Sequence, residues 1–199
     1  MKIKTTFAVF ILCLFVISGC QSSNVQKTQD TFKTPPEESS KVRKTHDTFK
    51  ITLPKDIPSF VKEKDFENID FNKSVTVFDT GTRNDMVGNK NKIGFIGPDL
   101  NSNGEPDFKA NETQKWLWHF WGVNKGDLTI VGYNADTLKI TPVLGDGWSR
   151  KNGIGGGKIE GADSSMPSHV TFPEAGRWAL LVYIDGKLFD TLVMDVKGE

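Results

Sequence analysis

One stretch of the sequence has the residue types of a calcium loop. Oxygen-bearing side chains stand at alternate positions and a glycine takes the sixth position, which is the pattern of oxygen ligands that calcium prefers. The twelfth position holds Ala110 instead of the expected bidentate glutamate. A polar Asn-Gly turn between two strands is therefore the alternative interpretation. The candidate ligands are Asp99, Asn101, Asn103, Glu105 through its backbone carbonyl, and Asp107.

A second stretch holds the side-chain types of a hydrolase, because serines lie between Asp163 and His169. Serine, histidine and aspartate together can form a nucleophilic triad. The chain has no Gly-x-Ser-x-Gly elbow, and a triad is not built from one contiguous loop and the start of a strand. We therefore expect a loop in which these residues cap turns, and we predict that the protein is not an enzyme. Asp163 and His169 are retained as candidate contacts for a partner.

A glycine-rich segment, residues 153–158, precedes this stretch. It lacks the spacing and the Lys-Ser/Thr end of a phosphate-binding loop. The segment is therefore predicted to be a mobile loop that could contact a partner.

Aromatic residues concentrate in the second half of the chain, where all five tryptophans lie between Trp116 and Trp178. In the run 116–121, apolar residues occupy both faces of a predicted strand and His119 is the only polar residue. That composition is typical of a buried central strand, in which a histidine is a satisfied core residue. The alternative is an aromatic platform for sugar rings or for a protein partner, formed by Trp121 or Trp148.

The start of the chain has the features of a targeting signal. Lys2 and Lys4 precede an apolar run, residues 7–17, and Ser18-Gly19-Cys20 follow it. A basic start, an apolar middle and small residues before the cut site make a secretory signal peptide. The run is about half of the roughly 20 residues that cross a bilayer. A cysteine after the small pair resembles the lipobox of bacterial lipoproteins, so we expect diacylation of Cys20, which anchors the mature protein stably to the membrane.

Residues 20–58 are polar and charged and are predicted to be a lipidated, disordered tether. A local repeat lies in it, with Thr28-Gln29-Asp30-Thr31-Phe32-Lys33 echoed by Thr45-His46-Asp47-Thr48-Phe49-Lys50. Duplication within a spacer and a pair of docking motifs are the two interpretations. A tether of this length reaches about 30–35 Å on average.

The charge balance restricts the partners. The chain has 25 basic and 25 acidic side chains, and losing Lys2 and Lys4 with the signal leaves 23 against 25. A net charge of about −2 argues against nucleic acid as a partner, since nucleic-acid binding normally needs a basic face. Removal of Cys13 with the signal also leaves no disulfide, so the mature domain must be stabilised by core burial.

Residues 59–199 are predicted to form an all-β, antiparallel immunoglobulin-like sandwich of about seven to nine strands. Asp185-Gly186 between two apolar runs is the strongest hairpin signal, because both turn positions need positive φ. A short helix or turn is expected over residues 59–68. The predicted strands are 75–78, 92–96, 116–121, 127–133, 137–144, 168–172, 178–184 and 188–196.

Three segments carry a family resemblance: residues 115–122 (Lys-Trp-Leu-Trp-His-Phe-Trp-Gly), 172–178 (Phe-Pro-Glu-Ala-Gly-Arg-Trp) and 186–189 (Gly-Lys-Leu-Phe). Together they resemble a family of small Gram-positive, Bacillus-type lipoproteins over roughly residues 71–196. The resemblance implies an immunoglobulin-like sandwich on a lipid-anchored stalk, and it implies no activity. The family's Gly-Ala-Asp-Ala-His run is matched only over residues 161–163, so a metal role for that histidine has no counterpart here.

The sequence therefore predicts a lipid-anchored lipoprotein on the extracytoplasmic face of the cell membrane. We expect its domain to be a binding module for an envelope protein or for wall glycan. The alternatives are an accessory of a wall-active enzyme and a proteinase-inhibitor-like protein that works through an exposed loop.

Overall fold

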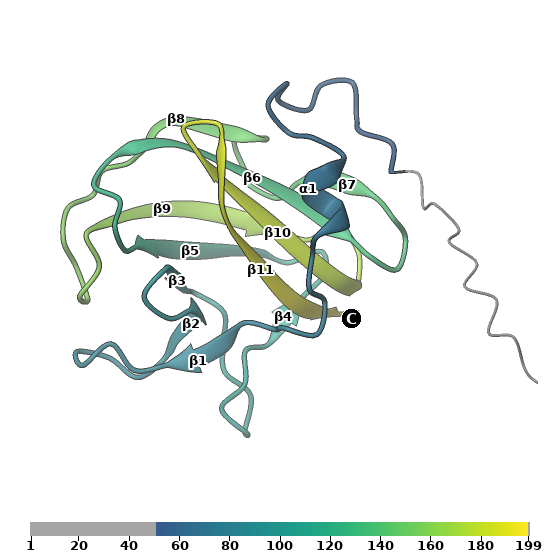
Figure 1. Ribbon diagram of the computed structural model, residues 1–199. Coiled ribbons are helices and arrows are strands. Elements are labelled where there is room, and N and C mark those ends of the chain that lie inside the picture. Colours follow the sequence, from purple (N-terminus) through teal and green to yellow (C-terminus); the bar gives the residue numbers. More distant parts are fainter. Residues whose placement is uncertain (1–50, 199) are drawn as a thin grey trace, which may run out of the picture. The chain divides into compact units, whose positions relative to one another are not determined.

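The computed structural model describes residues 51–198 of the chain, which form two β-sheets packed face to face (Figure 1). The predicted all-β sandwich is thus confirmed. The five-stranded sheet has the order β1-β2-β3-β5-β9. Its strands are β1 (Thr76–Phe78), β2 (Met86–Asn89), β3 (Ile93–Ile96), β5 (Thr113–Phe120) and β9 (Ser164–Thr171).

The six-stranded sheet has the order β4-β11-β10-β6-β7, and β8 pairs with β6 beside β7. Two long antiparallel pairs, β10 with β11 and β10 with β6, form its centre, while β4 pairs with β11 in parallel. Its strands are β4 (Phe108–Lys109), β6 (Gly126–Asn134), β7 (Ile140–Pro142), β8 (Ser149–Ile154), β10 (Gly176–Ile184) and β11 (Lys187–Lys197).

All eight predicted strands are present, and the described residues contain three more that the sequence did not indicate. β4 has two residues, β2 contains a glycine and an asparagine, and β8 is mostly polar, so none carries an apolar alternation. β8 also takes in Gly153 and the buried Ile154, which the sequence placed in a mobile loop. The strand predicted from residue 137 begins at Ile140, because Leu138 turns at φ 65° and is 45% exposed.

The hairpin between β10 and β11 has the predicted two-residue turn. Ile184 pairs with Lys187, and the intervening Asp185 and Gly186 have φ values of 49° and 74°. Both values lie in the left-handed region that a type I′ turn requires. The turn therefore sets the pairing of Ile184 with Lys187 and of Tyr183 with Leu188, and a bulge between Val182 and Tyr183 shifts the register beyond them.

The core between the sheets is dominated by aromatic side chains. Trp116, Trp118 and Phe120 occupy alternate positions of β5 and are fully buried, because they share one core cluster with inward side chains of β6 and β10 in the other sheet. The Phe95 ring stacks on Trp116 with centroids 4.1 Å apart and planes 3° apart. Such pairs contribute about 0.5–1.5 kcal/mol beyond burial of their area. The predicted central strand is thus confirmed, with Trp116 and Trp118 in the core, while Trp121 follows β5 and is only half-buried.

Residues 51–73, here called the strap, cover the outer face of the six-stranded sheet and contain α1 (Lys64–Glu67) (Figure 1). Val61 and Phe66 are buried there, against the outward side chains of β6, β10 and β11. Ile51, Leu53 and Ile57 also pack on this cluster. The packed chain therefore includes residues 51–58, which the sequence had placed in the tether.

Polar side chains fasten the strap to the sheet at three places. Trp148 Nε1 donates to the Asp56 carboxylate at 2.9 Å, and the Tyr183 hydroxyl donates to Asp65 at 2.9 Å. Arg177 donates through Nη2 to the Phe71 carbonyl oxygen. Burial first, and the Asp65 hydrogen bond second, raise the pKa of Tyr183 far above its usual range. The hydroxyl is therefore a permanent donor.

Candidate functional site

The outer face of the five-stranded sheet is covered differently, by two loops. Phe78 of β1 pairs with Met86 of β2. Gly94 of β3 pairs with Gly88 of β2 on one side and with His119 of β5 on the other. A Cβ on Gly94 would lie 2.7 Å from Met86 Cγ and 3.1 Å from Phe78 Cζ. The missing side chain thus lets both apolar groups lie over the sheet. The face carries a small cluster of Phe78, Met86 and His119.

Trp121, immediately after β5, lines an open hollow beside this cluster. The Trp121 ring lies 6.1 Å from the Phe78 ring and 6.4 Å from the His119 ring, centroid to centroid. The hollow has a volume of about 650 Å³. We call it the Trp121 hollow, and its lining residues are Phe78, Asp79, Thr80, Gly81, Lys90, Asn91, Trp121, Glu160 and Gly161. It combines two aromatic rings with carboxylates, an amide and an ammonium group.

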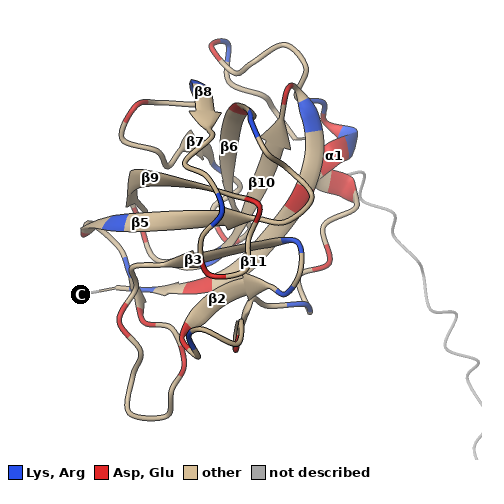
Figure 2. Ribbon diagram, turned by 90° about the vertical axis from the view of Figure 1, so that its left-hand side faces the viewer, with Lys and Arg blue, Asp and Glu red and all other residues tan. Residues whose placement is uncertain are grey.

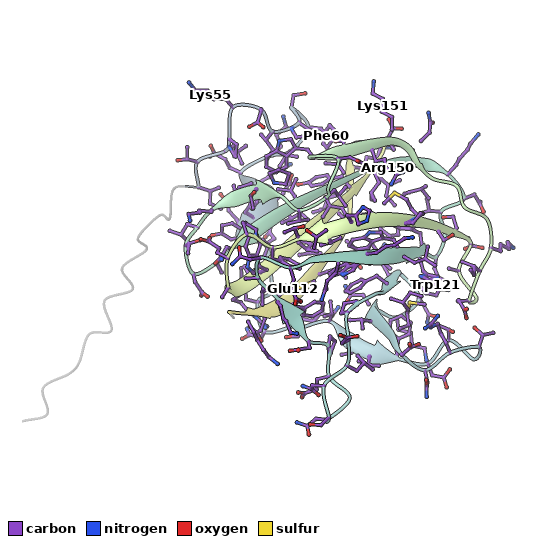
Figure 3. The ribbon with its side chains drawn as sticks, turned by 180° about the vertical axis from the view of Figure 1, so that it is seen from behind. Lys55, Phe60, Glu112, Trp121, Arg150 and Lys151 are labelled. Atoms are coloured by element: carbon purple, nitrogen blue, oxygen red, sulfur yellow. The ribbon has the colours of Figure 1, made fainter. Side chains whose placement is uncertain are left out.

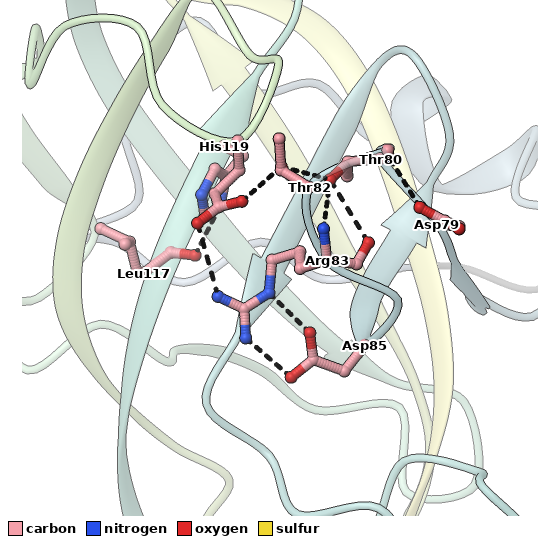
Figure 4. A network of polar contacts seen from close by, with 9 residues as sticks. Asp79, Thr80, Thr82, Arg83, Asp85, Leu117 and His119 are labelled. Carbon is pink, nitrogen blue, oxygen red and sulfur yellow. Dashed lines mark hydrogen bonds and ion pairs between the residues drawn. The ribbon is translucent and has the colours of Figure 1, made fainter.

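The 79–85 loop and the 155–162 loop meet above His119 through a polar clasp, defined as Thr82, Arg83, Asp85 and Glu160 (Figure 4). Arg83 makes a bidentate pair with Asp85, at 2.5 and 2.7 Å. The Thr82 hydroxyl donates to Glu160, and the Arg83 guanidinium lies 3.9 Å from the same carboxylate. The hydrogen bond from Arg83 lowers the pKa of Asp85, so this pair stays ionised.

His119 is fully buried beneath the clasp. Its Nδ1 lies 3.0 Å from the Leu117 carbonyl oxygen. Since a carbonyl only accepts, Nδ1 carries the proton of the neutral ring. Nε2 is the only buried side-chain nitrogen or oxygen among residues 51–198 without a hydrogen-bond partner. Burial lowers the pKa of His119. The predicted satisfied core histidine is therefore only half satisfied, and a bare acceptor remains.

Asp163 positions Trp121. Its carboxylate accepts a hydrogen bond from the Gly122 N–H at 2.7 Å, and its own N–H donates to the Phe120 carbonyl at 2.9 Å. The Lys158 ammonium lies 3.8 Å from the same carboxylate. Asp163 therefore fixes the turn that carries the Trp121 indole. The structure thus brings together Trp121 and Asp163, two of the predicted site residues.

The structure places Trp148 and His169 elsewhere. Trp148 is half-buried against the strap, on the outer face of the opposite sheet. Figure 3 shows Phe60 of the strap and Trp121 on opposite sides of the sandwich. His169 is exposed on β9 and pairs with Lys115, four positions along β5 from His119. Neither residue reaches the Trp121 hollow.

The serines near His169 have structural partners. The Ser168 hydroxyl accepts from Trp118 Nε1 at 2.8 Å inside the core, and the Ser164 hydroxyl donates to the Val123 carbonyl. Ser168 therefore faces the core, while the next residue, His169, is exposed. These side chains are not arranged as a nucleophile and its base.

The predicted calcium loop is hydrogen-bonded as a turn. Asn101 Oδ1 accepts from the backbone N–H groups of Asn103 and Glu105, at 2.8 and 3.0 Å. Asp107 pairs with the Lys197 ammonium at 2.7 Å, and that hydrogen bond lowers its pKa. Within residues 51–198 no three His, Cys, Asp or Glu side chains are grouped to hold a metal. Calcium binding by Asp99 and the asparagines stays a prediction, which melting with and without calcium would test.

The clasp was not detectable in the sequence, because Thr82 and Glu160 lie 78 positions apart in unremarkable polar stretches. Acidic and basic positions are interspersed along the elements in view in Figure 2, in keeping with the balanced composition. In the part of the chain that the structure describes, no helix is both long enough and apolar enough to span a membrane. Cys20 and the repeated motif lie outside the described residues.

Comparisons with known proteins agree with the fold. The sequence model of a family described as "Domain of unknown function (DUF4871)" matches residues 60–194. A solved X-ray structure of a "Putative Lipoprotein from Bacillus anthracis" is similar, with a TM-score of 0.53 and 19% sequence identity. The match covers 70% of this chain and 96% of that one. No curated protein sequence matches the chain.

Proposed function

The chain belongs to the family described as Domain of unknown function (DUF4871), and from that premise we propose that it is a lipid-anchored, extracytoplasmic binding module. Its β-sandwich would be held outside the cell membrane by a diacylated Cys20. The Trp121 hollow would be its binding site. The partner would be an envelope protein or wall glycan, and the chemistry would be recognition without catalysis.

The anchor is supported by the order of residues at the start of the chain. Lys2 and Lys4, the apolar run and Ser18-Gly19-Cys20 follow the signal-and-lipobox pattern. The structural neighbour that carries the word lipoprotein in its name supports the same reading. Radiolabelled palmitate should enter the wild-type protein in growing cells and should fail to enter Cys20→Ala. Equal labelling of both would contradict the anchor.

The Trp121 hollow is the observation that carries the binding role. Ligand sites are concave, apolar-floored and edged by a few polar groups, with volumes of about 300–1,000 Å³. A half-buried indole beside Phe78, edged by Asp79, Lys90 and Glu160, has that composition. If residues 116–121 served only the core, both faces of that segment would be covered and no open hollow would be needed beside Trp121. The hollow also lies on the sheet opposite the strap, so residues 51–73 do not cover it.

A pull-down with cell envelopes tests this role. The mature chain carrying Cys20→Ser is incubated with envelope fragments, beside Trp121→Ala and Trp148→Phe in the same background. We expect wild type and Trp148→Phe to be retained and Trp121→Ala to be lost, with all three giving the same β-type circular dichroism spectrum. Equal retention of the three proteins would place binding elsewhere.

The two alternative functions predicted from the sequence would depend on different residues and have different measurable effects. An accessory of a wall enzyme should also depend on Trp121, but it should change the rate of a wall hydrolase added to the same envelopes. A proteinase-inhibitor-like protein should depend on the 155–162 loop and should slow a proteinase. Assaying both activities with the Trp121→Ala protein separates them from simple binding.

A further inference from the structure

Resting on the binding function proposed above, we propose that the Trp121 hollow takes a sugar ring, and that His119 Nε2 accepts a hydrogen bond from that ligand when the polar clasp opens. The sugar would stack on the Trp121 indole. One hydroxyl or amide N–H of the ligand would reach the imidazole nitrogen that the closed protein leaves without a partner. The 79–85 and 155–162 loops would then act as the cover of the inner half of the site.

The bare nitrogen defines what the ligand must offer. Nδ1 of His119 is committed as a donor to the Leu117 carbonyl, so Nε2 holds a lone pair and no proton. A buried polar atom without a partner costs free energy that a hydrogen bond would recover. The complementary group is therefore a donor, such as a sugar hydroxyl or an acetamido N–H, and a carboxylate or phosphate oxygen would be repelled.

His119 is adjacent to the hollow and covered by only a few polar contacts. Its ring is nearly parallel to the Trp121 ring, with planes 29° apart and centroids 6.4 Å apart. Glu160 belongs both to the lining of the hollow and to the clasp. Parting of Thr82 from Glu160 would extend the hollow toward His119 and give one continuous surface of indole and imidazole.

The clasp has the exposure expected of a cover that opens. The Arg83 and Glu160 side chains are 27% and 25% exposed, and their charged groups are 3.9 Å apart. Partly exposed ion pairs of this kind are typically worth no more than about one hydrogen bond, since water replaces their partners. Ile159 in the same loop is 40% exposed, so little apolar burial holds the 155–162 loop down.

The lining favours a sugar over a peptide. Peptides that add a strand to a sheet are recognised through main-chain hydrogen bonds along a free strand edge. The Trp121 hollow is instead lined by side chains from loop tips and from one sheet face. Asp79, Lys90 and Asn91 provide acceptors and donors at its rim, which match the paired hydroxyls of a sugar. The aromatic floor matches the apolar face of the ring.

Titration of the mature Cys20→Ser chain with chitotetraose, followed by calorimetry and by ¹⁵N NMR of the histidine side chains, tests the inference. We expect binding that Trp121→Ala abolishes and that His119→Phe weakens about two- to tenfold, the range for one lost hydrogen bond. The Nε2 resonance of His119 should move upfield while Nδ1 stays in place. Thr82→Val should tighten binding, because it raises the population of the open cover.

The outcomes separate this inference from the proposed function. Trp121-dependent sugar binding without a change at Nε2 or in His119→Phe would overturn the role of His119 and leave the binding module intact. Trp121-dependent retention by envelopes without chitotetraose binding, or binding of a wall stem peptide in its place, would overturn the sugar. If His119→Phe does not fold, the Nε2 resonance and Thr82→Val decide, and a Thr82→Val protein that binds like wild type would overturn the cover.

Discussion

The two outer faces of the sandwich are both covered, and the covers differ in chemistry. On the six-stranded sheet the strap buries Val61 and Phe66 against Tyr133 and its neighbours. On the five-stranded sheet the two loops meet through hydroxyl and charged groups, over a histidine with a bare nitrogen. The first cover completes a core, whereas the second closes over an unsatisfied atom.

This difference in chemistry distinguishes a cover that stabilises the fold, the strap, from a cover that controls access to a site, the clasp. Apolar burial contributes about 25 cal/mol for each Å² removed from water, and it is lost only when the strap leaves the sheet. A polar clasp exchanges its partners for water at low cost. The face that carries the strap should therefore respond to mutation in stability, and the face that carries the clasp should respond in binding. The predictions below test this division.

The largest effect is expected at the strap. Phe66→Ala should lower the free energy of unfolding by about 3–5 kcal/mol, because it leaves a cavity against Tyr133, whose ring lies 5.4 Å away. Urea unfolding of the mature chain measures the loss. The matched control is Lys64→Ala in the same helix, which is exposed and should change stability by about 0.5 kcal/mol or less. A loss below about 1 kcal/mol in Phe66→Ala would mean that the strap is not part of the core.

A smaller effect is expected where a hydrogen bond fastens the strap. Tyr183→Phe should cost about 1.5 kcal/mol, since its hydroxyl donates to the Asp65 carboxylate at 2.9 Å, and bonds to charged groups are worth about 1.5–3 kcal/mol. Tyr133→Phe on the same face is the control, because burial alone raises the pKa of that tyrosine. Equal losses of stability from the two substitutions would show that the hydrogen bond to Asp65 does not stabilise the fold.

On the face that carries the clasp, the stability of the protein should depend on pH through His119. His119 has a folded pKa below its unfolded value near 6.5, so its contribution to stability is complete above pH 6.5 and is lost as the pH falls toward the folded pKa. Burial is the main cause of the lowered pKa; the Leu117 hydrogen bond and Glu160 oppose it, and Arg83 adds to it. Between the two pKa values the loss is about 1.4 kcal/mol per pH unit.

Thermal melting of wild type and His119→Phe from pH 7.5 to 5.0 measures this contribution. The wild-type melting temperature should fall over that range more steeply than that of the variant. Identical slopes for the two proteins would mean that His119 does not sit neutral beneath the clasp.

The sequence predicted the sandwich because its signals are local. The alternation of Trp116, Trp118 and Phe120 and the Asp185-Gly186 turn each determine a strand or a turn without knowledge of the rest of the chain. Residues 51–58 of the strap were placed in the tether because Ile51, Leu53 and Ile57 are separated by polar residues and prolines. Their packing depends on an apolar face supplied by β6, β10 and β11.

The candidate site was predicted only in part, for the same reason. Trp121 was recognised from its type, and Asp163 from its neighbours, without a sign that the two meet at Gly122. Trp148, of the same type, turned out to face the strap, because pairing with β6 directs its segment to the other sheet. A hydroxyl and a carboxylate from loops far apart in the chain leave no pattern in the sequence until the sheet brings them together.

The smallest effect on stability, and the sharpest test of the comparison, is expected from Thr82→Val. It removes the donor to Glu160 and keeps the shape of the side chain, so unfolding should become easier by about 1 kcal/mol or less. Hydrogen exchange should nevertheless quicken at amides of both loops, because the lost hydrogen bond is the shorter of the two polar contacts through which Glu160 joins them. Thr76→Val on β1 is the control, since its hydroxyl makes only a 3.5 Å contact with the Gly88 carbonyl. If exchange in the 155–162 loop is as slow in Thr82→Val as in Thr76→Val, the loop is held by its own packing, and the two covers do not differ as described.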